Sequence, residues 1–178
     1  MDWKQIIDKY YTDNDELKDI LIRHSRAVAE KALSIAEKHP ELNLDTTFIE
    51  EASMLHDIGI IKTDAPDIKC YGTEPYIRHG VLGAEMLRTE GFPRHARVCE
   101  RHTGAGLSFN EIVSRNLPLP HMDLLPETLE EQVICYADKF FSKTRLDTEK
   151  TIEQAEKSVA KHGEEGLKRF CKWKEMFE

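Results

Sequence analysis

The sequence predicts an all-α fold of roughly seven to nine helices, because apolar residues recur at spacings of three and four along most of its length. Capping signals precede several of these stretches, and no stretch alternates apolar and polar residues as an amphipathic strand does. Apolar residues make up 40% of the 178 positions, which excludes a disordered chain and supports a buried core.

Each expected helix has recognisable signals at its ends. The helices are expected over residues 2–11, 15–39, 47–57, 79–90 and 93–102, then from 128 through Phe141, and as two final helices divided near 163–166. Thr47 with Glu50, and Thr128 with Glu131, have the spacing of capping boxes. Pro40 ends the long second helix because its ring cannot continue the hydrogen-bond pattern.

The segment after the third helix lacks helical periodicity. Gly59 is expected to end that helix, and residues 60–76, with two prolines and a glycine, are expected to form a long loop of the kind that often carries function. No repeat or linker interrupts the chain, so a single domain over residues 1–178 is expected. Its motif-bearing core spans about 15–146, and C-terminal helices follow over about 147–178.

The formal net charge of −8 limits the classes of partner. Nucleic-acid polymers are bound through many Lys and Arg side chains, so an acidic chain argues against them. A small phosphorylated ligand remains compatible because a bound metal supplies local positive charge. No signal peptide or membrane-spanning run is recognisable, and the four scattered cysteines form no CxxC pair. A cytoplasmic protein with no membrane partner and no thiolate zinc site is therefore expected.

Six His and Asp residues stand where the helical pattern predicts burial or a helix end. They are His24, His56, Asp57, His79, His102 and Asp138. A lone histidine on an apolar face is usually a hydrogen-bonded core residue, but so many buried imidazoles and carboxylates are hard to satisfy separately. One shared metal centre satisfies them all, and this ligand set suits iron, manganese, zinc or cobalt better than calcium or magnesium.

In order and context these residues resemble the HD-domain phosphohydrolases, a family defined by His, then His-Asp, then Asp on a helical scaffold. The string at residues 55–59 reads Leu-His-Asp-Ile-Gly, which is similar to the HDIG form of the motif, with His24 before it and Asp138 after it. His79 and His102 match two further histidines of a bimetallic subset. The HD dipeptide alone would be weak, but the ordered set of six is fairly specific.

The resemblance implies an HD-domain-like helical bundle and a division of the ligands between two metals. His24, His56, Asp57 and Asp138 would bind the first ion, His79 and His102 would bind the second, and Asp57 would bridge the two. It implies two divalent transition-metal ions, iron first, with manganese, zinc, cobalt or nickel as alternatives. A hydroxide bridging the metals would attack phosphorus, which is the general chemistry of two-metal sites.

Cations near the centre are needed to contact phosphate. Arg145 lies seven residues beyond Asp138, roughly on the same face two turns along, in a setting that resembles bacterial diadenosine-tetraphosphate hydrolases. Lys62, in the loop after the His-Asp pair, is the second candidate. We expect Asp57, Lys62 and Arg145 to act in catalysis. Lys139 and Arg101 adjoin ligand residues but are equally well explained as solvated surface cations.

The predicted function is hydrolysis of a phosphate ester or phosphoanhydride of a small nucleotide-like substrate. One alternative is a mononuclear 5'-nucleotidase-like enzyme, in which His79 and His102 contact substrate. Another is a non-catalytic nucleotide- or metal-binding module. The chain has no adjacent histidine pair after residue 102 and no Gly-Tyr-Pro string, so it departs from the cyclic-dinucleotide phosphodiesterases. Residues 60–76 and 107–126 are expected to form the pocket, while the substrate and the oligomeric state remain open.

Overall fold

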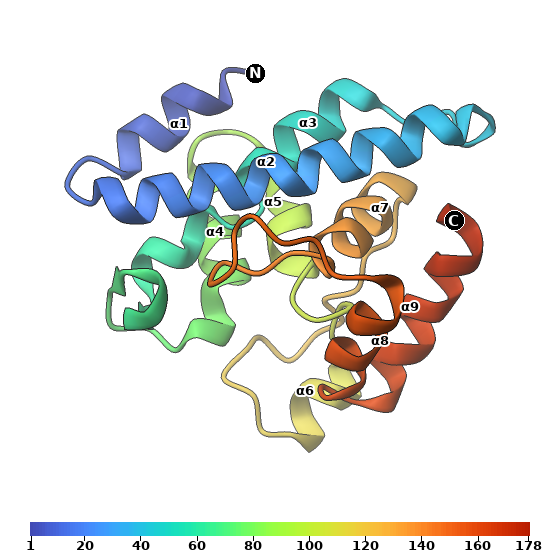
Figure 1. Cartoon of the computed structure of the whole chain (residues 1–178). Helices are drawn as coiled ribbons and strands as arrows, with labels where there is room; N and C mark the ends of the chain where they lie inside the picture. The colour runs from blue at the N-terminus through green and yellow to red at the C-terminus, as the bar shows by residue number, and fades with distance from the viewer.

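The structure, a computed structural model that describes residues 1–178, contains nine α-helices and one small sheet, which confirms the all-α prediction (Figure 1). The helices are α1 (Trp3–Tyr10), α2 (Asp15–Lys38), α3 (Thr46–Leu55), α4 (His79–Thr89), α5 (Pro93–Arg101), α6 (Phe109–Ser114), α7 (Leu129–Asp138), α8 (Ile152–Ala160) and α9 (Glu164–Phe177). None of them is both long enough and apolar enough to cross a bilayer.

The long helix α2 crosses the molecule and joins two hydrophobic clusters (Figure 1). One cluster packs the second half of α2 against α3, α7, α8 and α9, and Val28 and Tyr136 are fully buried in it. The other packs α1 and the first half of α2 against α4 and α5, and it contains Leu21. His24 lies one turn from Leu21 and one turn from Val28. It therefore occupies the junction of the two clusters.

Two predicted helix ends differ from the structure. Helix α3 is capped by Asp45, whose carboxylate accepts the N–H of Phe48 at 3.0 Å, so Thr47 lies inside the first turn and forms no capping box. The carboxylate is the stronger local acceptor at that position. Helix α7 does have the predicted box of Thr128 and Glu131, but it ends at Asp138 instead of continuing through Phe141. Tight turns follow it, and the loop 139–151 leads to α8.

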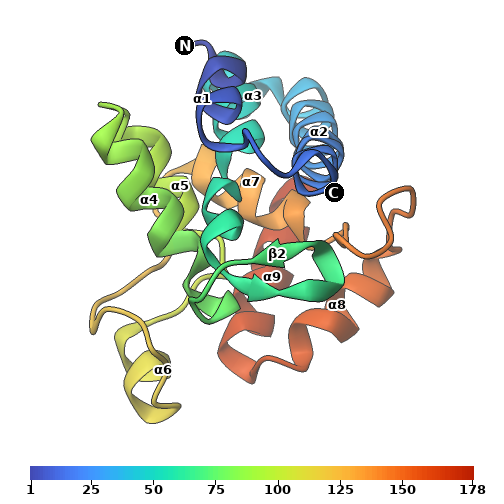
Figure 2. The ribbon, with the colours of Figure 1, turned by 90° about the vertical axis from the view of Figure 1, so that its left-hand side faces the viewer.

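The segment predicted as a loop is an ordered flap, which lies at the front of the molecule in Figure 2. Strands β1 (Asp64–Ala65) and β2 (Cys70–Tyr71) pair antiparallel, with short 3-10 turns before, between and after them. Gly59 is not a helix cap, because α3 has already ended and Gly59 lies in the first of these turns. Its missing side chain serves packing: a Cβ there would overlap the backbone of His79 and Gly83 in α4.

Helix α6 was not predicted, because it is only six residues long. Its signal was nevertheless present, since Ser108 and Glu111 form a complete capping box. A small apolar cluster around Leu107, Ile112 and Leu124 holds the segment that contains α6. The backbone of Leu107 pairs with that of Leu124. Residues 107–124 are thereby fixed as a separate arm at one end of the molecule (Figure 1).

Candidate metal centre

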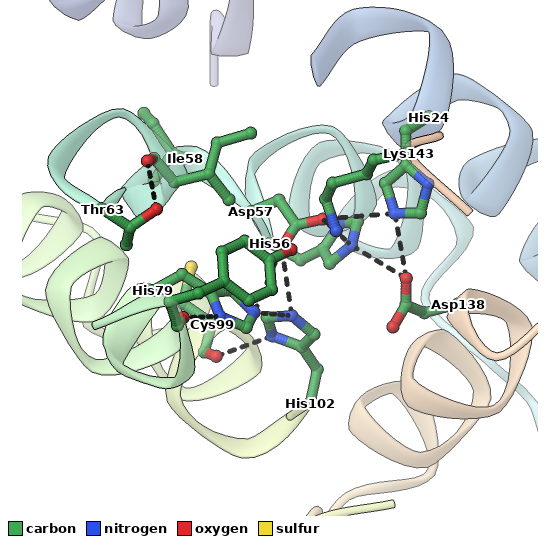
Figure 3. Close-up of polar contacts among 12 residues, drawn as sticks. His24, His56, Asp57, Ile58, Thr63, His79, Cys99, His102, Asp138 and Lys143 are labelled. Atoms are coloured by element: carbon green, nitrogen blue, oxygen red, sulfur yellow. Dashed lines mark hydrogen bonds and ion pairs between the residues drawn. The ribbon is translucent and has the colours of Figure 1, made fainter. Parts of the chain in front are cut away.

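The six predicted ligands meet at one buried point, although they come from five separate helices or helix ends (Figure 3). Only His24 belongs to the middle of a helix; the others stand where helices begin or end. The donor atoms form two sets, and within each set all of them lie within 4.8 Å of one another. The first is His24, His56, Asp57 and Asp138, and the second is Asp57, His79 and His102. This is the convergence that the sequence predicted.

Asp57 lies between the two sets, and its two carboxylate oxygens face different histidines. Its Oδ2 is 3.2 Å from Nε2 of His24 and 3.0 Å from Nε2 of His56. Its Oδ1 is 3.4 Å from Nε2 of His79 and 3.2 Å from Nε2 of His102. The carboxylate is fully buried. One side chain therefore has one oxygen available to each set of ligands.

Backbone carbonyls fix the protonation pattern of three imidazoles. The Nδ1 atoms of His56, His79 and His102 each lie 2.7 Å from the carbonyl oxygen three residues earlier. A carbonyl only accepts, so each Nδ1 donates a proton and each Nε2 is directed at the centre, where it is a free acceptor whenever the ring is neutral. Histidines that ligate metals are held in this way.

The second set, Asp57, His79 and His102, brings acceptor atoms together with no donor from the protein between them. Nε2 of His79 and Nε2 of His102 face each other at 3.0 Å, and in the tautomers just described both are acceptors. Oδ1 of Asp57 and Nε2 of His56 are buried without a hydrogen-bond partner, while Oδ2 of Asp57 has the Lys143 ammonium beside it. The two facing lone pairs and the unsatisfied Oδ1 require a cation between them. The donor set, imidazole nitrogen with carboxylate oxygen, suits a divalent transition metal.

The ends of the helices favour positive charge at the same place. His56 and His102 are the C-caps of α3 and α5, and Asp138 is the last residue of α7. Three helix C-termini, each with partial negative charge on its free carbonyl groups, therefore point toward the centre. A carboxylate at such an end is electrostatically unfavourable unless a cation accompanies it.

Two lysines that follow α7 supply part of that charge. Lys143 Nζ lies 2.6 Å from Oδ2 of Asp57, and Lys139 Nζ lies 2.7 Å from Oδ2 of Asp138. Both side chains are nearly buried, at 12% and 13% exposure, and Figure 3 shows Lys143 extending from its loop to the carboxylate. The prediction treated Lys139 as a candidate cation and did not include Lys143. Tyr76 was also missed, and its ring stacks on His79 with centroids 4.7 Å apart.

The pKa values around the centre reflect this crowding of charge. Burial opposes ionisation of Asp57, but His56 and Lys143 outweigh it and hold the pKa of the carboxyl well below its usual range. Burial would lower the pKa of His56, but the charge of Asp57 and a hydrogen bond with Asp138 raise it to about 9. Burial dominates at His79 and lowers its pKa to about 3, so this imidazole stays neutral.

A cavity of about 670 Å³ opens onto the centre. Its lining includes His24, His79, His102 and Asp138 at the inner end. The flap contributes residues 65–68, which confirms part of the predicted 60–76 wall, and the arm contributes Leu107, Glu111 and Arg115. Helices α8 and α9 form a further side that was not predicted. A space of this size accommodates a small phosphorylated molecule.

The structure does not bring the predicted phosphate cations to the cavity. Lys62 and Arg145 are exposed, and neither lines it. The projection of Arg145 assumed a helix that continues past Asp138, and α7 ends there. Arg101 is buried with its guanidinium bound to Glu127 and to the carbonyl of Leu125, so it anchors the chain on the far side of α5.

Comparisons with known proteins agree with the geometry. The sequence model of the HD domain family matches residues 21–142. An uncharacterized protein of Methanocaldococcus jannaschii is 36% identical over 146 residues, which cover 80% of this chain and 79% of that relative. No solved structure matches the chain.

Two further relatives are named tRNA (cytidine(56)-2'-O)-methyltransferase. The protein of Picrophilus torridus is 34% identical over 148 residues, covering 78% of this chain and 39% of the relative. The protein of Thermoplasma volcanium is 32% identical over 157 residues, covering 87% of this chain and 42% of the relative. The chain thus spans about two-fifths of the length of each methyltransferase.

Proposed function

The chain belongs to the HD domain family, and on that premise we propose that it is a metal-dependent phosphohydrolase of small nucleotide-like substrates. The substrate would be a phosphate ester or a phosphoanhydride. The observation that carries the proposal is Asp57, whose two oxygens face two separate pairs of histidine nitrogens. A carboxylate in this position suits a pair of ions that share it as a bridging ligand.

The ligands divide between two ions as the sequence suggests. His24, His56, Asp57 and Asp138 would hold one, and His79 and His102 with the other oxygen of Asp57 would hold the second. When bound, two such ions activate water and neutralise the negative charge of the phosphoryl group in the transition state. Iron is our first choice, with manganese, zinc, cobalt or nickel as alternatives, because imidazole and carboxylate accept several of these metals.

The protein groups around the centre have two tasks in this proposal. Lys143 and Lys139 balance the carboxylates and place ammonium groups at the inner end of the cavity, where a phosphoryl group would enter. Such fixed cations stabilise negative charge without reorganising during the reaction. The Tyr76 ring covers one face of His79, and the Tyr76 backbone carbonyl accepts the Nδ1–H of His79. Both contacts keep the imidazole oriented.

The proposed partner is a small phosphorylated molecule and not a nucleic-acid polymer. The net charge of −8 disfavours long contacts with phosphate backbones. A cytoplasmic setting is proposed with it, since all four cysteines are free thiols and three of them are buried. We place these functions in one domain spanning the chain.

The test is phosphate release from a panel of nucleoside mono- and diphosphates by protein reconstituted anaerobically with iron or manganese. We expect release by the wild-type chain and a loss of at least about a thousandfold in Asp57→Ala, since the proposed bridge is gone. Asp147→Ala is the matched control, because the Asp147 side chain is 87% exposed and its ion pair is with the surface residue Arg23. Metal-loaded protein that releases phosphate from no member of the panel would contradict the proposal.

A mononuclear centre is the competing assignment within the same reaction class. In that case His79 and His102 would contact substrate instead of metal. His79→Ala separates the two assignments, because it removes one metal equivalent from a two-metal centre and none from a one-metal centre. Circular dichroism of the same variant shows that the fold is intact. If His79→Ala retains all of the bound metal, the two-metal assignment is wrong and the one-metal assignment replaces it.

A further inference from the structure

The cavity continues beyond the metal centre to a second group of basic side chains. Lys150 lines it from the end of the 139–151 loop, Arg115 from the end of α6, and His162 from the turn between α8 and α9. A guanidinium N–H of Arg115 donates to the carbonyl oxygen of His162 at 3.1 Å and so joins the arm to the C-terminal helices. Three separate segments therefore contribute basic groups to the lining of one cavity.

These basic groups have no acidic partner, which sets them apart from the lysines at the centre. Neither Lys150 nor Arg115 forms a salt bridge, whereas Lys139 and Lys143 are each paired with a carboxylate. Lys150 Nζ instead approaches the carbonyl of Lys139 at 3.4 Å. Cations that cluster without counter-charges are unusual in a chain with a net charge of −8.

The acidic groups of the lining do not neutralise this cluster. Glu111 is committed elsewhere, because its carboxylate is bound to Arg169 at 2.8 Å and to the backbone N–H of Ser108. Asp67 lines the cavity from the flap and forms no salt bridge with Lys150 or Arg115. Asp138 belongs to the metal centre and to Lys139.

The pKa values report the same excess of positive charge. Burial lowers the pKa of Lys150, and Lys139 and Lys161 lower it further against the opposing effect of Asp138. Burial and then Lys139, Arg115 and Lys161 lower the pKa of His162. Lys139 and Lys161 thus act on both Lys150 and His162, and Arg115 acts on His162, so an anion bound in this part of the cavity would offset these repulsions.

We propose that Lys150 and Arg115, with His162 at the rim, form a second anion-binding subsite, so that the substrate carries a negatively charged group besides the phosphoryl group at the metals. The substrate class is a nucleotide with at least two phosphates, either a nucleoside 5'-diphosphate or a nucleoside 3',5'-bisphosphate. This inference rests on the proposed function, since the metal centre defines which phosphate reacts. In the hydrolysis a bond forms from phosphorus to the oxygen of water, the bond from phosphorus to the leaving oxygen breaks, and one proton of the water passes to that leaving oxygen or to solvent. The other anionic group stays at the subsite through this step and leaves with the product to which it is attached.

The experiment compares adenosine 5'-monophosphate, adenosine 5'-diphosphate and adenosine 3',5'-bisphosphate as substrates of the manganese-loaded chain. We expect kcat/KM to be at least about tenfold higher for one of the two doubly phosphorylated compounds, and the preferred compound identifies the spacing of the anionic groups. Lys150→Gln and Arg115→Gln should remove most of that preference, because they lower kcat/KM for the doubly phosphorylated compounds several-fold more than for the monophosphate. Lys157→Gln is the matched control, because Lys157 is exposed on α8 and does not line the cavity.

A binding measurement separates this inference from the proposed activity. Calorimetry with adenosine 3',5'-bisphosphate and adenosine 5'-diphosphate on metal-free protein should show a several-fold weaker Kd in Lys150→Gln than in the wild type and the control. Hydrolysis without any preference for a second phosphate would overturn the subsite and leave the activity standing. Binding that depends on Lys150 but is not followed by hydrolysis would support the subsite and contradict the proposed hydrolytic function. Binding that is equal in all variants would overturn the subsite.

Discussion

The orientation of single imidazole rings is the most informative feature at the scale of residues. His56, His79 and His102 each donate Nδ1–H to the carbonyl three residues earlier, at 2.7 Å in every case. The same hydrogen bond satisfies a backbone carbonyl near a helix end and turns a bare Nε2 toward the centre. The Nε2 atoms of all three face other members of the cluster, and those of His79 and His102 face each other at 3.0 Å, a pairing that suits a shared cation better than a hydrogen bond.

We expect the negative charge of the buried Asp57 carboxylate to be neutralised by Lys143 together with the bound metals. In Lys143→Met the buried carboxylate of metal-free protein loses its closest cation, at 2.6 Å, so the free energy of unfolding should fall by about 3 kcal/mol. In metal-loaded protein the ions supply that charge, and less than half of the loss should remain. Urea denaturation with chelator and with excess manganese measures both values. Lys157→Met, at an exposed position, should change either by less than about 0.5 kcal/mol. An equal loss in the two states would mean that Lys143 acts only by packing.

The sequence predicted the six residues that converge at the candidate centre, and of the two lysines beside them it named Lys139 but not Lys143. These six were recognisable because each is a polar group where the helical pattern predicts burial or a helix end, and because their order resembles the HD motif. Arg145 was placed by extending a helical repeat past Asp138, and the helix ends at that residue. Lys143 has no pattern of its own, because a loop with no period brings it to Asp57. Its position depends on the path of the 139–151 loop and follows only from tertiary structure.

At the scale of elements, the centre is built from the ends of helices held close to one another. The turn containing Gly59 packs directly on α4, which brings Asp57 and His79 together. The motif glycine is thus required because backbone meets backbone there. Its φ is not in the left-handed region, so conformational freedom is not the reason. Gly59 was expected to end a helix because a local sequence pattern carries no information on this close approach.

Gly59→Ala tests this close approach. The added methyl group would overlap the carbonyl oxygen of His79 and the amide of Gly83, so we expect a loss of about 2–3 kcal/mol in the free energy of unfolding, with weakened metal binding. Gly166→Ala is the control in α9, where a Cβ would make only an ordinary contact at 3.8 Å with Ala105. That change should be neutral or stabilising by up to about 1 kcal/mol, because alanine favours a helix. A neutral Gly59→Ala in urea denaturation would refute the packing role.

The arm that carries α6 is fastened to α9 by an ion pair whose strength depends on pH. Burial alone would raise the pKa of Glu111, but hydrogen bonds from Ser108 and Arg169 outweigh it and hold the pKa below 4.5. The folded state therefore binds this proton less readily than the unfolded state. The contribution to stability is present above pH 4.5 and disappears as the pH falls through the lowered pKa.

Glu111→Gln should accordingly destabilise the protein by about 1 kcal/mol at pH 7 and by progressively less below pH 4.5. Urea midpoints of wild type and variant at pH 7 and pH 4 give the comparison. Glu164→Gln, with a side chain that is 80% exposed, is the control and should show no such dependence. A difference that stays constant with pH would show that the Glu111 carboxylate does not hold the arm.

At the scale of the whole molecule, the centre lies at the junction of two hydrophobic clusters, and α2 links them through His24. Rigid apolar packing on both sides can hold six polar side chains in a buried arrangement that would otherwise be costly. The charge is divided in a similar way. The chain as a whole has a net charge of −8, while the cavity beyond the centre holds basic groups without acidic partners.

The overall architecture was predictable because its helices are long, strongly periodic and marked by caps. Most differences between the predicted and observed elements lie in short or irregular segments, such as α6 and the flap with β1 and β2. These segments are too short to show a hydrophobic periodicity. The cavity wall formed by α8 and α9 also escaped prediction. Amphipathic periodicity shows that these helices bury a face, but it does not show which element they bury it against.

Metal content per chain is the measurement that bears most directly on a shared two-metal centre. Protein purified without chelator, or reconstituted anaerobically with iron or manganese, should contain two equivalents by elemental analysis. One equivalent is expected in His79→Ala, and almost none in Asp57→Ala. A wild-type chain that binds no metal after reconstitution would contradict the two-metal centre and, with it, the hydrolytic function proposed for this protein.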